Sequence, residues 1–291
     1  MNNLDSHRHS HAHAHAHAHA LLDTQSVRWK DLVKYQRFET ARELCLPLPW
    51  LLLAVVCGQQ ATAVGATGSV QWGWIVAMGI AVIYVFMLGL RVAHNAFHGT
   101  LGLTPSGDHW VMGVISVMML GSSHAINYTH MYHHKHCMQK GDVEGELATL
   151  PFGRALLKSP IYPVYIHIVA LRDAPKLQKR WILAELAVSA LLQCMMLVWF
   201  ESPVYGLYSL MMLVANLSAP MVGIWAVHRQ CEGSAVNARS CRSRVVNFLT
   251  CGMFYHAEHH LFPAVPTRHL AELAMRIDAT GVRFLGVTEF G

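Results

Sequence analysis

Two long stretches of the 291-residue chain contain neither lysine nor arginine, and both are strongly apolar. One lies between Arg42 and Arg91, and the other lies between Arg180 and Arg229. Each stretch has room for two helices that cross a bilayer, because one crossing of the roughly 30 Å hydrocarbon layer takes about 20 residues. The sequence therefore predicts an all-α integral membrane protein with about four transmembrane helices, arranged as two hairpins.

Four segments have the length and hydropathy of such spans. Tryptophans stand at the ends of three of them, which is typical of helices that meet the interface between lipid and water. The weakest candidate is interrupted by Gln59 and Gln60. A fifth apolar stretch, 110–121, is too short to cross a bilayer, so we expect a re-entrant or interfacial segment there. The four expected spans are 46–64, 71–91, 181–200 and 203–227.

The basic residues also predict how the spans are oriented. All 22 lysines and arginines fall in the N-terminal segment, at Arg91, in the loop 127–180 or after His228. With four spans these regions share one side of the membrane, and the positive-inside rule makes that side cytoplasmic. We therefore expect both termini, and a histidine-rich cap, on the cytoplasmic side.

The first 25 residues differ in composition from the rest of the chain. They are polar and include the alternating run HAHAHAHAHA at 11–20. Such low-complexity sequence cannot bury a core, so we expect residues 1–25 to be disordered and give the run no specific role. Residues 26–291 are expected to form a single membrane domain.

Composition excludes several classes of protein. Only 13% of the residues are charged, about half of what soluble domains carry. The seven cysteines include no CxxC pair and do not form a disulfide framework. The basic pI comes without a basic stripe or an aromatic platform, so we expect no nucleic-acid partner. Neither a nucleotide-binding glycine loop nor a Ser-His-Asp arrangement is found.

Three short segments of the expected cap are rich in histidine. HNAFH at 94–98 has two histidines four residues apart, while HMYHH at 130–134 and HAEHH at 256–260 each have three at i, i+3 and i+4. On a helix these spacings place the imidazoles on one face. Neutral imidazole is a good ligand for iron, copper and zinc. The candidate ligands are His94, His98, His130, His133, His134, His256, His259 and His260, with His228 after the fourth span as a ninth.

The number of candidate ligands indicates more than one metal ion. A single zinc site takes about four protein ligands, so eight or nine imidazoles on one side of the membrane predict two ions. The remaining histidines do not share the spacing. His109 and His167 are interpreted as interfacial residues, and His124 and His136 lie outside the second box.

Three carboxylates are candidates for orienting the imidazoles. A metal-bound histidine usually donates its second ring nitrogen to a carboxylate or a carbonyl. Glu258 lies inside the third box, and Asp142 and Glu144 follow the second box. Asp142 and Glu144 are equally well explained as solvated loop residues.

The order HxxxH, HxxHH, HxxHH, between two hairpins of spans, resembles the membrane fatty acid desaturase and hydroxylase superfamily. The resemblance covers residues 45–275 and is most specific in NFLTCGMFYHAEHHLFPAVP, which is similar to the third box of the family and its Leu-Phe-Pro tail. It implies that the eight box histidines and His228 bind two non-haem iron ions. The segment KHCMQKGDVEGE departs from the sequence that follows the second box in many acyl desaturases.

The resemblance also implies an activity. It predicts an acyl-chain desaturase that uses O2 and two electrons, acts on a lipid or acyl chain, and has no catalytic residues beyond the metal centre. HNAFHGT is also similar to the first box of carotenoid ketolases and hydroxylases, so a lipid hydroxylase or ketolase is the alternative. No fused haem domain is found, so we expect a separate electron donor, such as a ferredoxin, a rubredoxin or a cytochrome b5 system. A metal transporter is a remote alternative. Such transporters place their metal ligands within the spans, but the expected span segments 71–90 and 181–227 contain no histidine.

Overall fold

The computed structural model describes residues 27–63, 71–231 and 236–281. The expected disorder of residues 1–25 lies outside the described residues. Within the described residues the chain is helical, and the only β interaction is one antiparallel bridge between Ser240 and Tyr255. The prediction of an all-α fold is confirmed.

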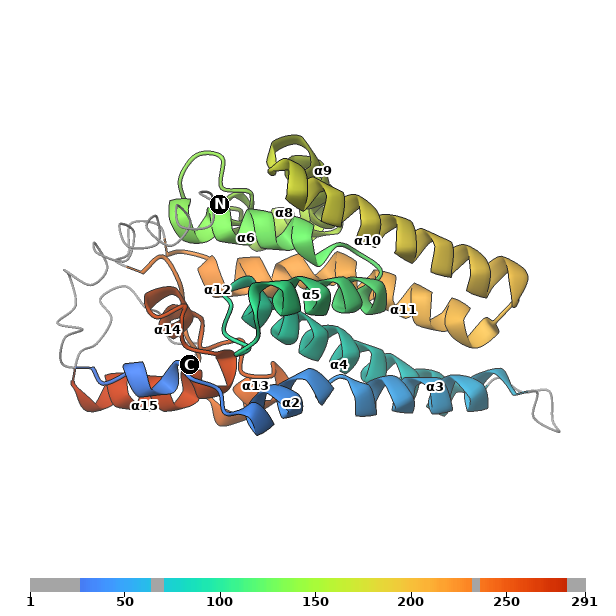
Figure 1. Ribbon diagram of the computed structural model, residues 1–291, viewed down its shortest axis with the longest axis horizontal. Coiled ribbons are helices and arrows are strands. Elements are labelled where there is room, and N and C mark those ends of the chain that lie inside the picture. The colour runs from blue at the N-terminus through green and yellow to red at the C-terminus, as the bar shows by residue number, and fades with distance from the viewer. Residues whose placement is uncertain (1–26, 64–70, 232–235, 282–291) are drawn as a thin grey trace.

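Four helical stretches are long and apolar enough to cross a membrane, namely Arg37–Thr62, Trp72–Phe97, Lys176–Trp199 and Pro203–His228. They form two hairpins whose outer ends lie at the right of Figure 1. The first hairpin consists of α3 (Leu48–Thr62) and α4 (Trp72–Phe97), and the second consists of α10 (Lys176–Cys194) and α11 (Pro203–Pro220). The prediction of four spans in two hairpins is therefore confirmed. The first span begins earlier than expected, because α2 (Arg37–Cys45) leads into α3.

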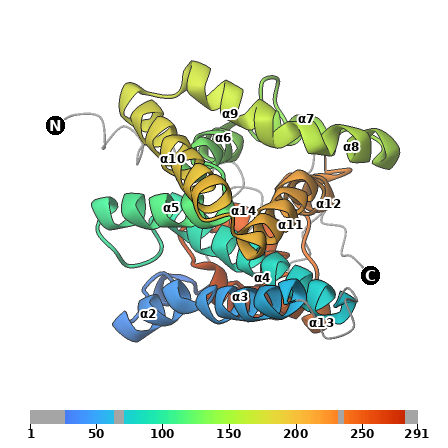
Figure 2. The same ribbon diagram turned by 90° about the vertical axis from the view of Figure 1, so that its right-hand side faces the viewer.

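Apolar side chains both join the hairpins and cover their outer surface. Met78 of α4 and Met212 of α11 are fully buried between the hairpins. Figure 2 looks at the outer ends of the spans and shows α4 between α3 and the second hairpin. The outward faces remain apolar, and Trp72 and Trp199 are 69% and 83% exposed at the outer ends. An apolar surface of this kind suits contact with lipid, and tryptophans are typical of its borders.

A bent pair of helices fills the space beside the hairpins. α5 (Pro105–Met119) and α6 (Ser123–His136) meet at 114°, and Leu120 between them has a left-handed backbone conformation with φ of 57°. In Figure 1 α5 runs away from the left end of the molecule and α6 returns toward it. The expected re-entrant segment 110–121 lies in α5 and the turn that follows it.

Both spans of the second hairpin contain a π-helical turn. η4 (Met195–Trp199) ends the third span, and η5 (Met221–Trp225) separates α11 from the short α12 (Ala226–His228). η5 directly follows Pro220, which has no backbone N–H to donate to the preceding turn. Single π turns within α-helices are frequent near functional sites, and His228 lies three residues after this one.

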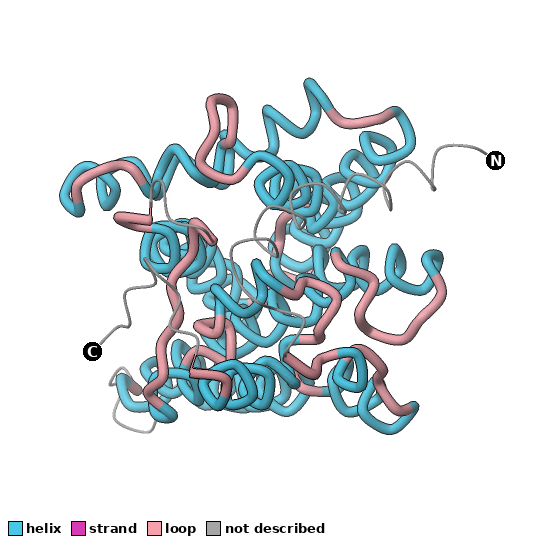
Figure 3. The backbone as a smooth tube through the Cα atoms, turned by 90° about the vertical axis from the view of Figure 1, so that its left-hand side faces the viewer, coloured by secondary structure: helices cyan, strands magenta, loops and turns pink. Residues whose placement is uncertain are grey.

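Short helices form a cap over one end of the spans, visible at the left of Figure 1 and from the front in Figure 3. A second apolar core, which includes Leu261, Phe262 and Leu273, joins two of these helices to the N-terminal segment. The cap contains α7 (Val143–Ala148), α8 (Phe152–Lys158), α9 (Tyr162–Asp173), α13 (Arg244–Leu249), α14 (His256–Leu261) and α15 (Leu270–Ala279), with 3-10 turns at Lys30–Leu32, Ser159–Ile161 and Thr267–His269.

Candidate metal centre

All nine candidate histidines, eight selected by spacing and His228 by its position after the fourth span, meet where the spans reach the cap, and we call them the imidazole cluster. The last turn of α4 carries His94, and the chain presents His98 directly after it. α6 carries the second box, α12 carries His228 and α14 carries the third box. Seven of the nine are buried, and the other two, His98 and His134, are half-buried.

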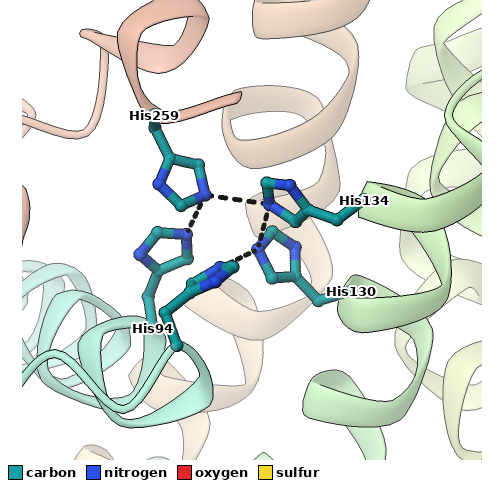
Figure 4. A group of neighbouring side chains, drawn as sticks. His94, His130, His134 and His259 are labelled. Atoms are coloured by element: carbon teal, nitrogen blue, oxygen red, sulfur yellow. Dashed lines mark hydrogen bonds between the residues drawn. The ribbon is translucent and has the colours of Figure 1, made fainter. Parts of the chain in front are cut away.

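Five imidazoles form one half of the cluster. The ligand atoms of His94, His98, His130, His134 and His259 all lie within 4.8 Å of one another. Their Nε2 atoms approach in a chain, with 3.0 Å from His94 to His259, 2.9 Å from His259 to His134 and 3.1 Å from His134 to His130. The Nε2 atoms of His98 and His130 are 3.2 Å apart. Figure 4 shows the labelled rings turned toward a common centre.

The other four imidazoles form the second half. The Nε2 atom of His228 lies 3.1 Å from that of His133 and 2.8 Å from that of His256. A ligand atom of His260 lies within 4.8 Å of those of His228 and His256. The two halves adjoin, because the ring centroids of His134 and His260 are 4.4 Å apart.

The nitrogen separations are those of neighbouring ligands on one metal ion. Two imidazoles bound at about 2.0–2.1 Å and at right angles have their nitrogens about 2.9 Å apart. The six Nε2 separations in the cluster range from 2.8 to 3.2 Å. The donor set is therefore spaced to hold metal.

The hydrogen bonds that the imidazoles make through Nδ1, away from the centre of the cluster, also indicate a metal site. His133 Nδ1 donates to Asp142 at 2.8 Å, and His228 Nδ1 donates to the carbonyl of Asn237 at 2.7 Å. A neutral ring that donates through Nδ1 presents a lone pair at Nε2. With both rings neutral, two lone pairs face each other across 3.1 Å, an arrangement that a cation between them would stabilise. His260 Nε2, also buried, has no hydrogen-bond partner among the described residues.

Burial favours the neutral rings that a metal needs. The pKa of His256, of His259 and of His260 is held well below its ordinary value, first by burial and then by neighbouring imidazoles. Burial disfavours the charged form of a histidine. These three rings of α14 are therefore neutral donors at physiological pH.

Two of the three expected carboxylates contact the cluster. Asp142 accepts from His133, and Glu144 accepts from His130 Nδ1 at 3.1 Å. Asp142 also caps α7, because it accepts from the backbone N–H of Glu144 at 3.1 Å. Burial raises the pKa of Asp142, but the hydrogen bond from His133 and backbone hydrogen bonds outweigh it and hold that pKa below its ordinary value.

Glu258 lies elsewhere, although it is inside the third box. Its carboxylate accepts from the hydroxyl of Ser240 and pairs with Arg242 at 2.7 Å. Burial raises its pKa, and Arg242 and Ser240 partly oppose that rise. Glu258 thus ties α14 to the segment before α13 and forms no hydrogen bond or ion pair with an imidazole of the described residues.

Four further histidines considered from the sequence, namely His109, His124, His136 and His167, lie outside the cluster. His124 contacts Glu185 at 2.5 Å, and His109 contacts His124 at 2.8 Å. His167 accepts from a backbone N–H near the α5–α6 turn, and the ring of His136 contacts the ring of Tyr132 at a tilt of 34°.

A buried ion pair behind His94 was not expected from the sequence. Arg91 donates to both carboxylate oxygens of Glu43, at 2.5 and 2.9 Å, and to the carbonyl of Cys251 at 2.7 Å. Asn95 donates to Glu43 at 3.1 Å and accepts from Thr267 at 2.8 Å. These contacts join α2, α4 and the cap beside the cluster. The spacing rule for histidine ligands gives no signal for such a pair.

Cys137 was also overlooked as a residue of the site. Its ligand atom lies within 4.8 Å of those of His133 and His260. It stands four residues after His133, which is the spacing that places two helical side chains on one face. The same rule that selected the histidines therefore contained the signal for this cysteine.

Replacing Glu144 with alanine is expected to weaken metal binding about 10–100-fold, the usual cost of losing a partner that orients a ligand imidazole. His130 then loses the acceptor for its Nδ1–H. Competition with a chelator measures the affinity. Glu146→Ala is the matched control, since Glu146 is exposed on the same helix. Equal affinities in the two variants would contradict the role of Glu144.

Comparisons with known proteins give the family. The sequence profile for fatty acid desaturases matches residues 71–285. A sphingolipid delta(4)-desaturase/C4-monooxygenase of Bos taurus is 24% identical over 260 residues, which is 82% of this chain and 76% of that protein. A sphingolipid delta(4)-desaturase of Pongo abelii is 22% identical with the same coverage. A WAT1-related protein of Arabidopsis thaliana is 39% identical, but over only 51 residues, 16% of this chain and 14% of that protein.

Proposed function

Because the chain belongs to the fatty acid desaturase family and is an oxidoreductase of the lipid desaturase type, we propose that it introduces a C=C bond into the acyl chain of a membrane lipid with two iron ions held by the imidazole cluster. One observation carries this proposal: nine imidazoles gather at ligand spacing where apolar spans meet the cap. Bound iron supplies the activation of O2 that removal of hydrogen from an unactivated C–H bond requires.

The overall reaction balances with one O2. The acyl chain gives up two hydrogen atoms, the donor gives two electrons, and two protons from solvent complete two molecules of water. We propose a separate electron donor of the ferredoxin, rubredoxin or cytochrome b5 type.

The residues of the chain position the metal and keep it buried. Asp142, Glu144 and the carbonyl of Asn237 each accept an Nδ1–H and so turn one imidazole toward the centre. Such outer partners fix the orientation of ligand rings. The apolar surface of the spans offers the substrate a route from the bilayer. We propose a sphingolipid-like substrate, since two relatives are named sphingolipid desaturases.

Hydroxylation is the second candidate for the reaction. The relative from Bos taurus is named both a delta(4)-desaturase and a C4-monooxygenase, and either product starts with removal of hydrogen from carbon. Mass spectrometry of lipids from expressing cells distinguishes the two outcomes. A desaturated product is lighter by two hydrogens, and a hydroxylated product is heavier by one oxygen.

Purified protein is expected to contain about two iron ions per chain, because nine imidazoles exceed the roughly four ligands of one site. The measurement is elemental analysis of detergent-purified protein that lacks residues 1–25, so that the His-Ala run adds no metal. Protein with one zinc ion, or with no metal, would refute the di-iron proposal.

We also propose that the cap and both termini face the cytoplasm, since the lysines and arginines concentrate on that side of the predicted spans. A membrane-impermeant maleimide should then label Glu201→Cys in intact cells and spare Lys140→Cys. Both positions are exposed. Glu201 lies between the two spans of the second hairpin, and Lys140 follows α6. The reverse labelling pattern would overturn the orientation.

A further inference from the structure

The two halves of the imidazole cluster do not have equal numbers of nitrogen donors. One half has five imidazoles, namely His94, His98, His130, His134 and His259. The other half has only four, and the sulfur of Cys137 lies beside it. Cys137 Sγ is 3.5 Å from His133 Nε2 and, like His133, lies within 4.8 Å of a ligand atom of His260.

This spacing fits a sulfur donor on the same ion as His133. With a metal–sulfur bond of about 2.3 Å and a metal–nitrogen bond of about 2.0–2.1 Å, two neighbouring donors are about 3.1 Å apart at a right angle and farther apart as the angle opens. The observed 3.5 Å lies within the range for two donors on one metal ion, as do the nitrogen separations.

Two further observations support a cation between these side chains. His133 Nε2 lies 3.1 Å from His228 Nε2 and 3.5 Å from the sulfur of Cys137, so three atoms that can bind a metal meet there. His260 is nine-tenths buried, and its Nε2 has no hydrogen-bond partner among the described residues. A buried polar atom without a partner is costly unless it binds something.

Charge also favours the sulfur. Nine neutral imidazoles bring no negative charge to two cations, while Asp142 and Glu144 contact only the far nitrogens of their imidazoles. A thiolate brings one negative charge directly to the ion.

We propose that Cys137 is the fifth donor of the second metal ion, beside His133, His228, His256 and His260. The thiol releases its proton to solvent when the metal–sulfur bond forms. The proposal rests on the metal centre of the proposed function, and it makes the two metal sites chemically different. One has five nitrogen donors, and the other has four nitrogens and one sulfur.

Cobalt(II) is the probe for this ligand. Loaded full-length protein is expected to show the near-ultraviolet sulfur-to-cobalt charge-transfer band that nitrogen ligands do not give. Cys137→Ser should lose the band. Cys231→Ser is the matched control and should keep it, because the buried sulfur of Cys231 donates to the carbonyl of Arg229 at 3.5 Å, whereas the half-buried sulfur of Cys137 lies beside His133. The His-Ala run contains no cysteine and cannot produce the band.

The outcomes separate the two proposals. Cobalt binding without a sulfur band, or a band that survives in Cys137→Ser, overturns the role of Cys137 and leaves the metal centre intact. Failure of the wild-type protein to bind cobalt overturns both proposals. X-ray absorption of the loaded wild-type protein needs no variant and decides the question even when Cys137→Ser does not fold. One sulfur at about 2.3 Å from a metal supports the proposal, and nitrogen neighbours alone refute it.

Discussion

Replacing His133 with alanine is expected to reduce the amount of lipid product more than about 100-fold, while the protein still inserts into the membrane. This loss is larger than the loss that follows when only a residue that orients a ligand imidazole is removed. His133 is fully buried, and its Nε2 contacts both His228 and Cys137. It therefore lies at the centre of the second half of the cluster. The measurement is the amount of desaturated lipid in cells that express equal amounts of membrane-inserted protein.

His136→Ala is the matched control for this variant. His136 belongs to the same helix and lies three residues farther along, but its ring contacts Tyr132 and takes no part in the cluster. The control should retain product at close to the wild-type amount. Turnover that persists in His133→Ala would refute the assignment of the cluster as the metal centre.

Removing Glu43 is expected to destabilise the protein by about 3–5 kcal/mol, because it leaves the guanidinium of Arg91 largely buried without its counter-charge. The side chain of Glu43 is fully buried and that of Arg91 is 13% exposed. Asn95 also loses an acceptor. The midpoint of thermal unfolding of Glu43→Ala in detergent, compared with that of wild type, measures the effect.

A double replacement separates charge from packing in this network. In Glu43→Leu with Arg91→Met, both charges are gone and apolar side chains fill the space, a change that is often neutral for buried pairs. The double variant should therefore recover much of the stability that Glu43→Ala loses. A double variant as unstable as the single one would show that the hydrogen bonds of Arg91 to Cys251 and of Asn95 to Glu43 are the larger contribution.

The spans could be predicted because membrane insertion depends on local properties of the sequence. Length, hydropathy and flanking tryptophans located all four spans. The first span was predicted to begin at residue 46, whereas the helical stretch begins at Arg37. Its first turns are polar and carry Glu43, which is buried only because Arg91 approaches from another helix. The sequence of one segment alone does not show that a residue of another helix lies against it.

The cluster was predictable in its members but not in its pairings. Helical spacing selected eight of the histidines and the end of the fourth span indicated His228, yet His94 meets His259 from 165 positions away. The division into two halves depends on how α4, α6, α12 and α14 pack. The same holds for Glu258, which the box spacing placed near the metal but which pairs with Arg242. Asp142 and Glu144 reach their imidazoles because α7 folds back on α6.

The π turn η5 makes the number of residues between Pro220 and His228 matter more than their identity. Each residue added to or removed from an α-helix rotates everything after it by about 100°. If Met221–Trp225 kept all five residues but closed into regular α-helix, the imidazole of His228 would turn away from His133 and His256. Relatives that keep this metal site should therefore either retain the π turn or lack one residue of the segment, while the side chains here vary freely.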